Sequence, residues 1–94
     1  MNPIIESNKE QLRALALRYG VGRLSVFGSM ARDDANAASD VDLLLENSEG
    51  LTGFQLGALQ MDAQDLLGRK VDLLTLHALH PLLREKILSE AVVL

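Results

Sequence analysis

The sequence predicts a small α/β domain in which aliphatic helices pack on a short three-stranded sheet. Three segments with apolar residues at helical spacing alternate with three short runs of strand-forming residues. Hydrophobic residues make up 48% of the 94 residues and aromatic residues only 3%, so the core must consist mainly of aliphatic side chains. No linker, repeat or low-complexity tract divides the chain, and we expect one domain over residues 1–94.

The first half of the chain predicts a helix, a strand and a short helix. Residues 3–19 carry apolar side chains at helical spacing, after an Asn-Pro start that is typical of a capped helix. Residues 23–27 (RLSVF) predict a strand that runs into a Gly-Ser turn at 28–29. The small and polar residues 30–38 predict a short helix followed by a loop.

The second half predicts two more strands and two more helices. Residues 40–46 are a compact hydrophobic run with aspartates at its start, and they predict the second strand. A helix over 52–68 is indicated by a capping-box pattern at its start and by glycine at its end. Residues 70–76 predict the third strand, and a last helix begins near Pro81.

Charge and composition exclude several classes of protein. The formal net charge of −4 argues against binding of long nucleic acids, because phosphate contacts normally need a clustered positive surface. The chain has no cysteine, which is compatible with a reducing cytoplasm. No apolar run approaches the roughly 20 residues that span a bilayer, and the amino terminus lacks the layout of a signal peptide. We therefore expect a cytoplasmic protein that has no membrane partner.

Three aspartates lie in the expected strands, where polar side chains are costly. Side chains alternate along a strand, so Asp40 and Asp42 project from the same face. Two neighbouring carboxylates repel each other when both are ionised, and a divalent cation removes that conflict. Mg²⁺ prefers such hard oxygen ligands. If Asp72 lies on the adjacent strand, it would join a second Mg²⁺ and accept a proton from an attacking hydroxyl.

The Gly28-Ser29 turn is a candidate phosphate site. It follows a strand and precedes small residues, so its backbone amides and the Ser29 hydroxyl can approach a triphosphate closely. Arg32 would neutralise phosphate charge. Because this turn joins two neighbouring strands, we expect phosphate donors and metal carboxylates to meet at one end of the sheet.

Each of these residues also has a simpler interpretation. A D-x-D pair can be a solvated strand terminus, and Asp72 can be a strand-edge aspartate. Gly28 can be an ordinary turn residue, and Ser29 can cap the short helix that follows. Arg32 can make a surface salt bridge of little energetic value.

Two short motifs connect these candidates to a known family. Residues 28–32 (GSMAR) and 39–44 (SDVDLL) resemble the GS-x-A-R and SD-x-D-L signature of minimal nucleotidyltransferases of the DNA polymerase β superfamily. The likeness continues in residues 70–73 (KVDL) and in the last segment of the chain. It implies a polymerase β-type nucleotidyltransferase fold, an α/β fold with a small mixed sheet of three strands packed by helices.

The resemblance also implies roles for the site residues. Gly28 and Ser29 would lie at the triphosphate of ATP, Asp40 and Asp42 on magnesium, and Asp72 would be the third acidic residue. Two magnesium ions are expected. One departure from the family pattern is the aspartate at position 33, where the family often has glycine.

Many minimal nucleotidyltransferases are the MntA-like antitoxin partners of HEPN-domain toxin ribonucleases, and some transfer AMP from ATP to a tyrosine of the toxin. The resemblance therefore implies a magnesium-dependent protein adenylyltransferase that acts as an antitoxin on a HEPN-type partner. Homo- or hetero-oligomers are both compatible with it. Two other functions stay open: a non-catalytic antitoxin that neutralises its partner by binding alone, and an α/β interaction module without a nucleotide site.

Overall fold

The structure is a computed structural model that describes residues 2–94. Its strands are β1 (Arg23–Phe27), β2 (Val41–Glu46), β3 (Val71–Thr75) and β4 (Val92–Val93). Its helices are α1 (Pro3–Ser7), α2 (Lys9–Arg18), α3 (Ser29–Arg32), α4 (Gly53–Leu67) and α5 (Pro81–Glu90), with a 3₁₀ turn, η1 (Leu76–Ala78), between β3 and α5. The expected α/β class is confirmed.

The sheet is mixed, as expected, but it has four strands and not three. The strand order is β3-β2-β1-β4, with β1 antiparallel to both β2 and β4 and β2 parallel to β3. The additional strand β4 spans two residues, which is too short to give the period-two pattern by which the other strands were predicted. Its pairing with β1 becomes visible only in the folded chain.

The predicted helix over 3–19 is divided into α1 and α2 at Asn8. The Asn8 side-chain amide donates to the Ile4 carbonyl at 2.8 Å, the group that the Asn8 backbone N–H would use in a continuous helix. The Asn8 backbone N–H donates instead to Ile5 O at 3.2 Å. The predicted N-cap is confirmed, because the Asn2 side chain accepts from the Ile4 N–H at 2.9 Å.

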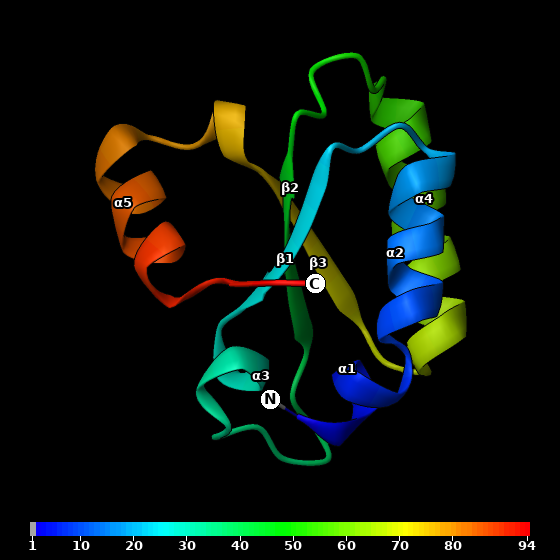
Figure 1. The fold of residues 1–94 in the computed structure, drawn as a ribbon, viewed down its shortest axis with the longest axis vertical. Helices are drawn as coiled ribbons and strands as arrows, with labels where there is room; N and C mark the ends of the chain where they lie inside the picture. Colours follow the sequence, from blue (N-terminus) through cyan, green and yellow to red (C-terminus); the bar gives the residue numbers. More distant parts are fainter. Residues whose placement is uncertain (1) are drawn as a thin grey trace.

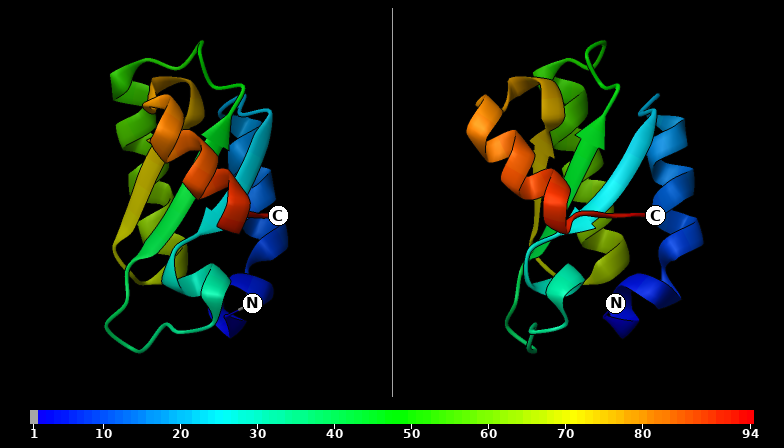
Figure 2. Two further views of the ribbon diagram at one scale, coloured as in Figure 1. Left: turned by 90° about the vertical axis from the view of Figure 1, so that its left-hand side faces the viewer. Right: turned by 60° about the vertical axis from the view of Figure 1, so that its left-hand side comes forward.

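Helices cover the two faces of the sheet unequally. Figure 1 shows α2 and α4 together on one side of the sheet and α5 on the other. The α2–α4 side holds the aliphatic core, with Leu24, Val26, Leu43 and Leu45 from the strands against residues such as Leu12 and Leu59. None of the residues of α5 is buried. Figure 2 views the sheet from the α5 side, with α5 lying obliquely over the strands.

The capping signals of α4 predicted its bounds correctly. Gln55 N donates to Thr52 Oγ1 at 3.1 Å, and Thr52 N donates to Gln55 Oε1 at 2.9 Å, which completes the capping box. Gly68 ends the helix in a left-handed conformation with φ 66°. Within residues 2–94, no helix has the length and apolar character needed to cross a membrane.

Candidate active site

The sheet brings Asp42 and Asp72 together. Asp42 lies in β2 and Asp72 in the parallel strand β3, and the two are direct register partners. Their side chains therefore project from the same face of the sheet, the face opposite the aliphatic core. Strand β3 is fixed at its start by α4, since Gln60 Nε2 donates to Val71 O at 2.7 Å and Val71 N donates to Gln64 Oε1 at 3.1 Å. The strand adjacency on which the site depends is thus present.

The predicted strand over 40–46 included Asp40. In the structure β2 begins at Val41, so Asp40 lies just before the strand. Its side chain is 45% exposed, and Lys70 Nζ lies 3.8 Å from its Oδ2. The preceding loop is held by Arg69, whose guanidinium donates to the carbonyls of Asn36 and Ser39 at 2.9 and 3.2 Å. Arg69 therefore positions the segment that carries Asp40. No local sequence pattern indicated this role.

The three aspartates interact electrostatically. Burial raises the pKa of the Asp42 carboxyl above its ordinary value, and the negative charges of Asp72 and Asp40 raise it further. The positive charge of Arg32 opposes this shift. Clustered negative charge on hard oxygen donors is the environment that suits a magnesium ion. Among residues 2–94, however, no three acidic or histidine side chains are gathered closely enough to hold a metal ion as they stand. The assignment of Asp40, Asp42 and Asp72 to magnesium thus stays a prediction.

Gly28 lies against the Asp42 carboxylate. A Cβ atom added at Gly28 would overlap with Asp42 Oδ2, so no larger residue fits without a shift. The Gly28 backbone has φ 71° and ψ −151°, a conformation that is essentially restricted to glycine. The close approach follows from the β1–β2 register, which pairs Phe27 with Asp42 and places the next residue of the turn at the carboxylate. Position 28 therefore requires glycine both for its backbone conformation and for its contact with Asp42.

Ser29 is the first residue of α3, and the N-cap position belongs to Gly28. The interpretation of Ser29 as a cap of this helix is therefore wrong. The helix ends at Arg32, and its C-cap residue Asp33 adopts the left-handed conformation with φ 62° and ψ 26°. Glycine suits that conformation best and aspartate tolerates it, which accounts for the departure from the family pattern at this position.

Arg32 lies beside the Gly28 turn but is engaged in ion pairs. Its Nε donates to Asp34 Oδ2 at 3.2 Å, and its Nη1 donates to Glu90 Oε2 at 3.3 Å. Glu90 also accepts from the Gly28 backbone N–H at 3.1 Å, through its Oε1. The hydrogen bond and charge of Asp34, with smaller contributions from Glu90, raise the pKa of the Arg32 guanidinium. Glu90 was absent from the predicted site, because only the pairing of β4 with β1 brings it there.

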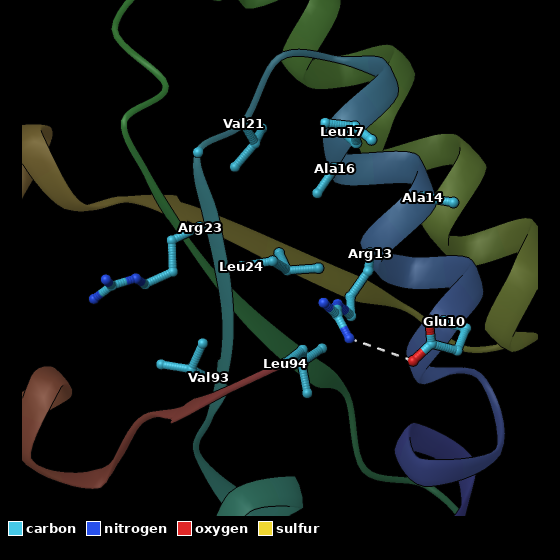
Figure 3. A pocket seen from close by; sticks show the side chains of 11 residues that line it. Glu10, Arg13, Ala14, Ala16, Leu17, Val21, Arg23, Leu24, Val93 and Leu94 are labelled. Carbon is cyan, nitrogen blue, oxygen red and sulfur yellow. Dashed lines mark hydrogen bonds and ion pairs between the residues drawn. The ribbon is translucent and has the colours of Figure 1, made fainter.

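Two grooves formed by residues 2–94 differ in the residues that line them. One, of about 750 Å³, is lined by both Asp42 and Asp72. Its other lining residues come mainly from α4, from β3 and from the segment around η1, and most of them are apolar. The second, of about 500 Å³, lies between α2, β1 and β4 and contains none of the predicted site residues. Figure 3 shows this second groove, with the Glu10–Arg13 ion pair of 3.3 Å at its wall. The first groove is the one that fits the candidate chemistry.

Comparison with known proteins places the chain in a family. Residues 8–94 match the nucleotidyltransferase domain family. A protein of Methanocaldococcus jannaschii, provisionally named a protein adenylyltransferase, is 41% identical over 88 residues, which cover 94% of this chain and 95% of that protein.

Solved structures agree with this assignment. A structure provisionally described as a minimal nucleotidyltransferase is 38% identical, with a TM-score of 0.88 over 100% of this chain and 97% of the other. One chain in the complex of a tri-AMPylated Shewanella oneidensis HEPN toxin with MNT antitoxin shares the fold. It is 17% identical, with a TM-score of 0.74, and the match covers 94% of this chain and 69% of that chain. The chain therefore belongs to the nucleotidyltransferase family and is a minimal nucleotidyltransferase related to the protein adenylyltransferases.

Proposed function

We propose that this chain transfers AMP from ATP to a hydroxyl group of a partner protein, with release of pyrophosphate. One observation carries the proposal: Gly28 abuts the Asp42 carboxylate, and Asp42 is the register partner of Asp72. A triphosphate on the Gly28 turn would therefore have its reacting phosphorus next to both aspartates. A donor site and an acidic site in contact are what nucleotidyl transfer requires.

In this proposal, the residues act from two sides of the reacting phosphate. Gly28, Ser29 and Arg32 bind and orient the triphosphate. Asp40 and Asp42 would hold magnesium, with Asp72 completing a two-ion site, and the metal would supply positive charge against the triphosphate oxygens. The acceptor oxygen forms a bond to the α-phosphorus, the bond from that phosphorus to the bridging oxygen breaks, and pyrophosphate leaves.

The proton of the acceptor hydroxyl needs a base on the side away from the leaving group. Asp72 lies at the β3 edge of the site, whereas Gly28 lies on the β1 side of Asp42. We therefore assign proton acceptance to Asp72. The groove that contains Asp42 and Asp72 also has apolar walls, which suits the approach of a protein side chain such as tyrosine.

The partner that we propose is a HEPN-type toxin, and the chain would act as its antitoxin in the cytoplasm, the compartment that supplies ATP. Support comes from the S. oneidensis complex, whose MNT antitoxin has the same fold and whose HEPN toxin carries AMP groups. The net charge of −4 disfavours a long polynucleotide as the acceptor, whereas it sets no such obstacle to a protein.

Intact-mass spectrometry of a HEPN-type partner tests the proposal. The partner is incubated with this chain, Mg²⁺ and ATP, and we expect it to gain the mass of AMP. The Asp40→Asn/Asp42→Asn double variant should lose at least about 100-fold in transfer rate, since even the loss of a residue that only supports a metal ligand costs 10- to 100-fold. Transfer at an undiminished rate by the double variant would overturn the assignment of these aspartates.

A second candidate function is neutralisation by binding alone. The observation that favours it is the exposure of leucines on α5, where Leu82 is 74% and Leu83 53% exposed. Such a surface suits a protein partner whether or not transfer occurs. Binding alone requires one copy of this chain per partner and no nucleotide. Transfer instead leaves a partner that stays neutralised after this chain has been removed.

A further inference from the structure

We propose that the Glu90 carboxylate is an internal competitor for the phosphate site, which nucleotide must displace from Gly28 and Arg32. This inference rests on the proposed function, since it concerns the regulation of the same site. It assigns to α5 and β4 an autoinhibitory contact that holds the phosphate donors while no nucleotide is bound.

The contacts of Glu90 are those expected of a bound phosphate oxygen. Its Oε1 accepts from the Gly28 backbone N–H at 3.1 Å, and its Oε2 accepts from Arg32 Nη1 at 3.3 Å. A backbone amide and a guanidinium are the two kinds of donor that bind phosphate in proteins. An anionic group that uses both donors excludes a phosphate from the same atoms.

The pairing of β4 with β1 places Glu90 at this position. Val92 pairs with Val26 and Val93 with Ser25, so the chain that leaves α5 at Glu90 enters the sheet beside the end of β1, where the Gly28 turn begins. Leu94 N donates to Leu24 O at 2.9 Å and extends the pairing at the other end. The pairing of β4 with β1 therefore brings Glu90 to the Gly28 turn, and its side chain makes the contact there.

The contact is also weak enough to be displaced. The side chains of Arg32 and Glu90 are 49% and 28% exposed, and ion pairs of this exposure contribute little to stability. Helix α5, which ends at Glu90, has no buried residue that resists a shift. A triphosphate with magnesium offers more charge to Gly28 and Arg32 than one carboxylate does.

Calorimetric titration with inorganic tripolyphosphate in excess Mg²⁺ tests the proposal. We expect Glu90→Gln to bind tripolyphosphate about two- to fivefold more tightly than the original chain, which corresponds to the loss of one exposed ion pair. Glu90→Ala should bind at least as tightly as Glu90→Gln, because it also removes the acceptor for the Gly28 N–H. The matched control is Glu85→Gln, which removes an exposed carboxylate from the same helix and should leave affinity unchanged.

The chemical shift of the Gly28 amide gives a readout that does not depend on nucleotide. In the free protein it should change in Glu90→Gln and not in Glu85→Gln. Unchanged or weaker tripolyphosphate binding by both Glu90 variants would overturn the proposal, and weaker binding would mean that Glu90 orients Arg32 for the phosphate. If no variant binds tripolyphosphate, the proposal also fails.

The inference and the proposed function can fail separately. If the Glu90 variants bind tripolyphosphate more tightly but the chain transfers no AMP, the competition by Glu90 is supported and the proposed function is wrong. If the chain transfers AMP but the original chain and both Glu90 variants bind tripolyphosphate with equal affinity, the proposed function is supported and the competition by Glu90 is wrong.

Discussion

The two faces of the sheet are built differently. Under α2 and α4, the strands bury a continuous aliphatic cluster that includes Val26, Leu43 and Leu45. On the opposite face lie Asp42 and Asp72, and the helix above them, α5, contributes no buried residue. The first face supplies most of the hydrophobic stabilisation, whereas the second holds charges that oppose burial. The packing of the first face therefore offsets much of the cost of the charges on the second.

The largest effect should come from the packed face. Leu43 is 2% exposed in the middle of β2, and truncation to alanine leaves a cavity among the buried side chains of the core. We expect Leu43→Ala to lower the free energy of unfolding by about 2–5 kcal/mol, measured by urea denaturation. Leu82→Ala on α5 removes the same group from a side chain that is 74% exposed, and it should change stability by no more than about 0.5 kcal/mol. Equal losses of unfolding free energy for Leu43→Ala and Leu82→Ala would show that the two faces do not differ in how much they stabilise the fold.

Gly28 lies in the turn that follows β1, against the Asp42 carboxylate. Its substitution should have the next largest effect. Gly28→Ala forces a Cβ into the Asp42 carboxylate and imposes a backbone conformation that alanine rarely adopts. We expect a loss of about 1–3 kcal/mol in unfolding free energy, together with loss of nucleotide binding.

Gly57→Ala is the matched control, because Gly57 lies within α4 and an added Cβ meets no atom within 4 Å beyond its own stretch of helix backbone. This variant should gain up to about 1 kcal/mol from the higher helix propensity of alanine. A stable Gly28→Ala that binds ATP normally would contradict the close approach of Gly28 to Asp42.

Local signals predicted most of the fold and named the residues of the candidate site, whose roles stay predictions. Helix α4 has a capping box and a terminal glycine, and β1 and β2 flank a glycine turn, so short-range patterns were sufficient. The register that pairs Asp42 with Asp72 was not predictable, because it depends on how α4 returns the chain to the sheet. For the same reason Glu90 was missed: its place beside Gly28 depends on a two-residue strand that pairs across more than 60 positions of the chain.

The smallest effect should come from the charge of Asp42 itself. Burial and the charges of Asp72 and Asp40 raise the pKa of Asp42 in the folded protein. The folded state then binds the proton more tightly than the unfolded state, whose aspartate pKa is about 3.9. Ionised Asp42 consequently destabilises the fold, and this cost grows as the pH rises from the unfolded pKa through the folded one.

Asp42→Asn should therefore raise the Tm at pH 7, and the gain should fade as the pH falls to the unfolded pKa of about 3.9 and below it, because Asp42 then becomes protonated in both states. Thermal denaturation from pH 3.5 to 7.5 measures this, with Glu49→Gln in the exposed loop before α4 as the control for a general change of net charge. A gain in Tm that is the same at every pH would mean that asparagine packs better and that charge is not the cause. A gain confined to neutral pH, combined with lost AMP transfer, would show that Asp42 is kept for its chemistry at a cost in stability.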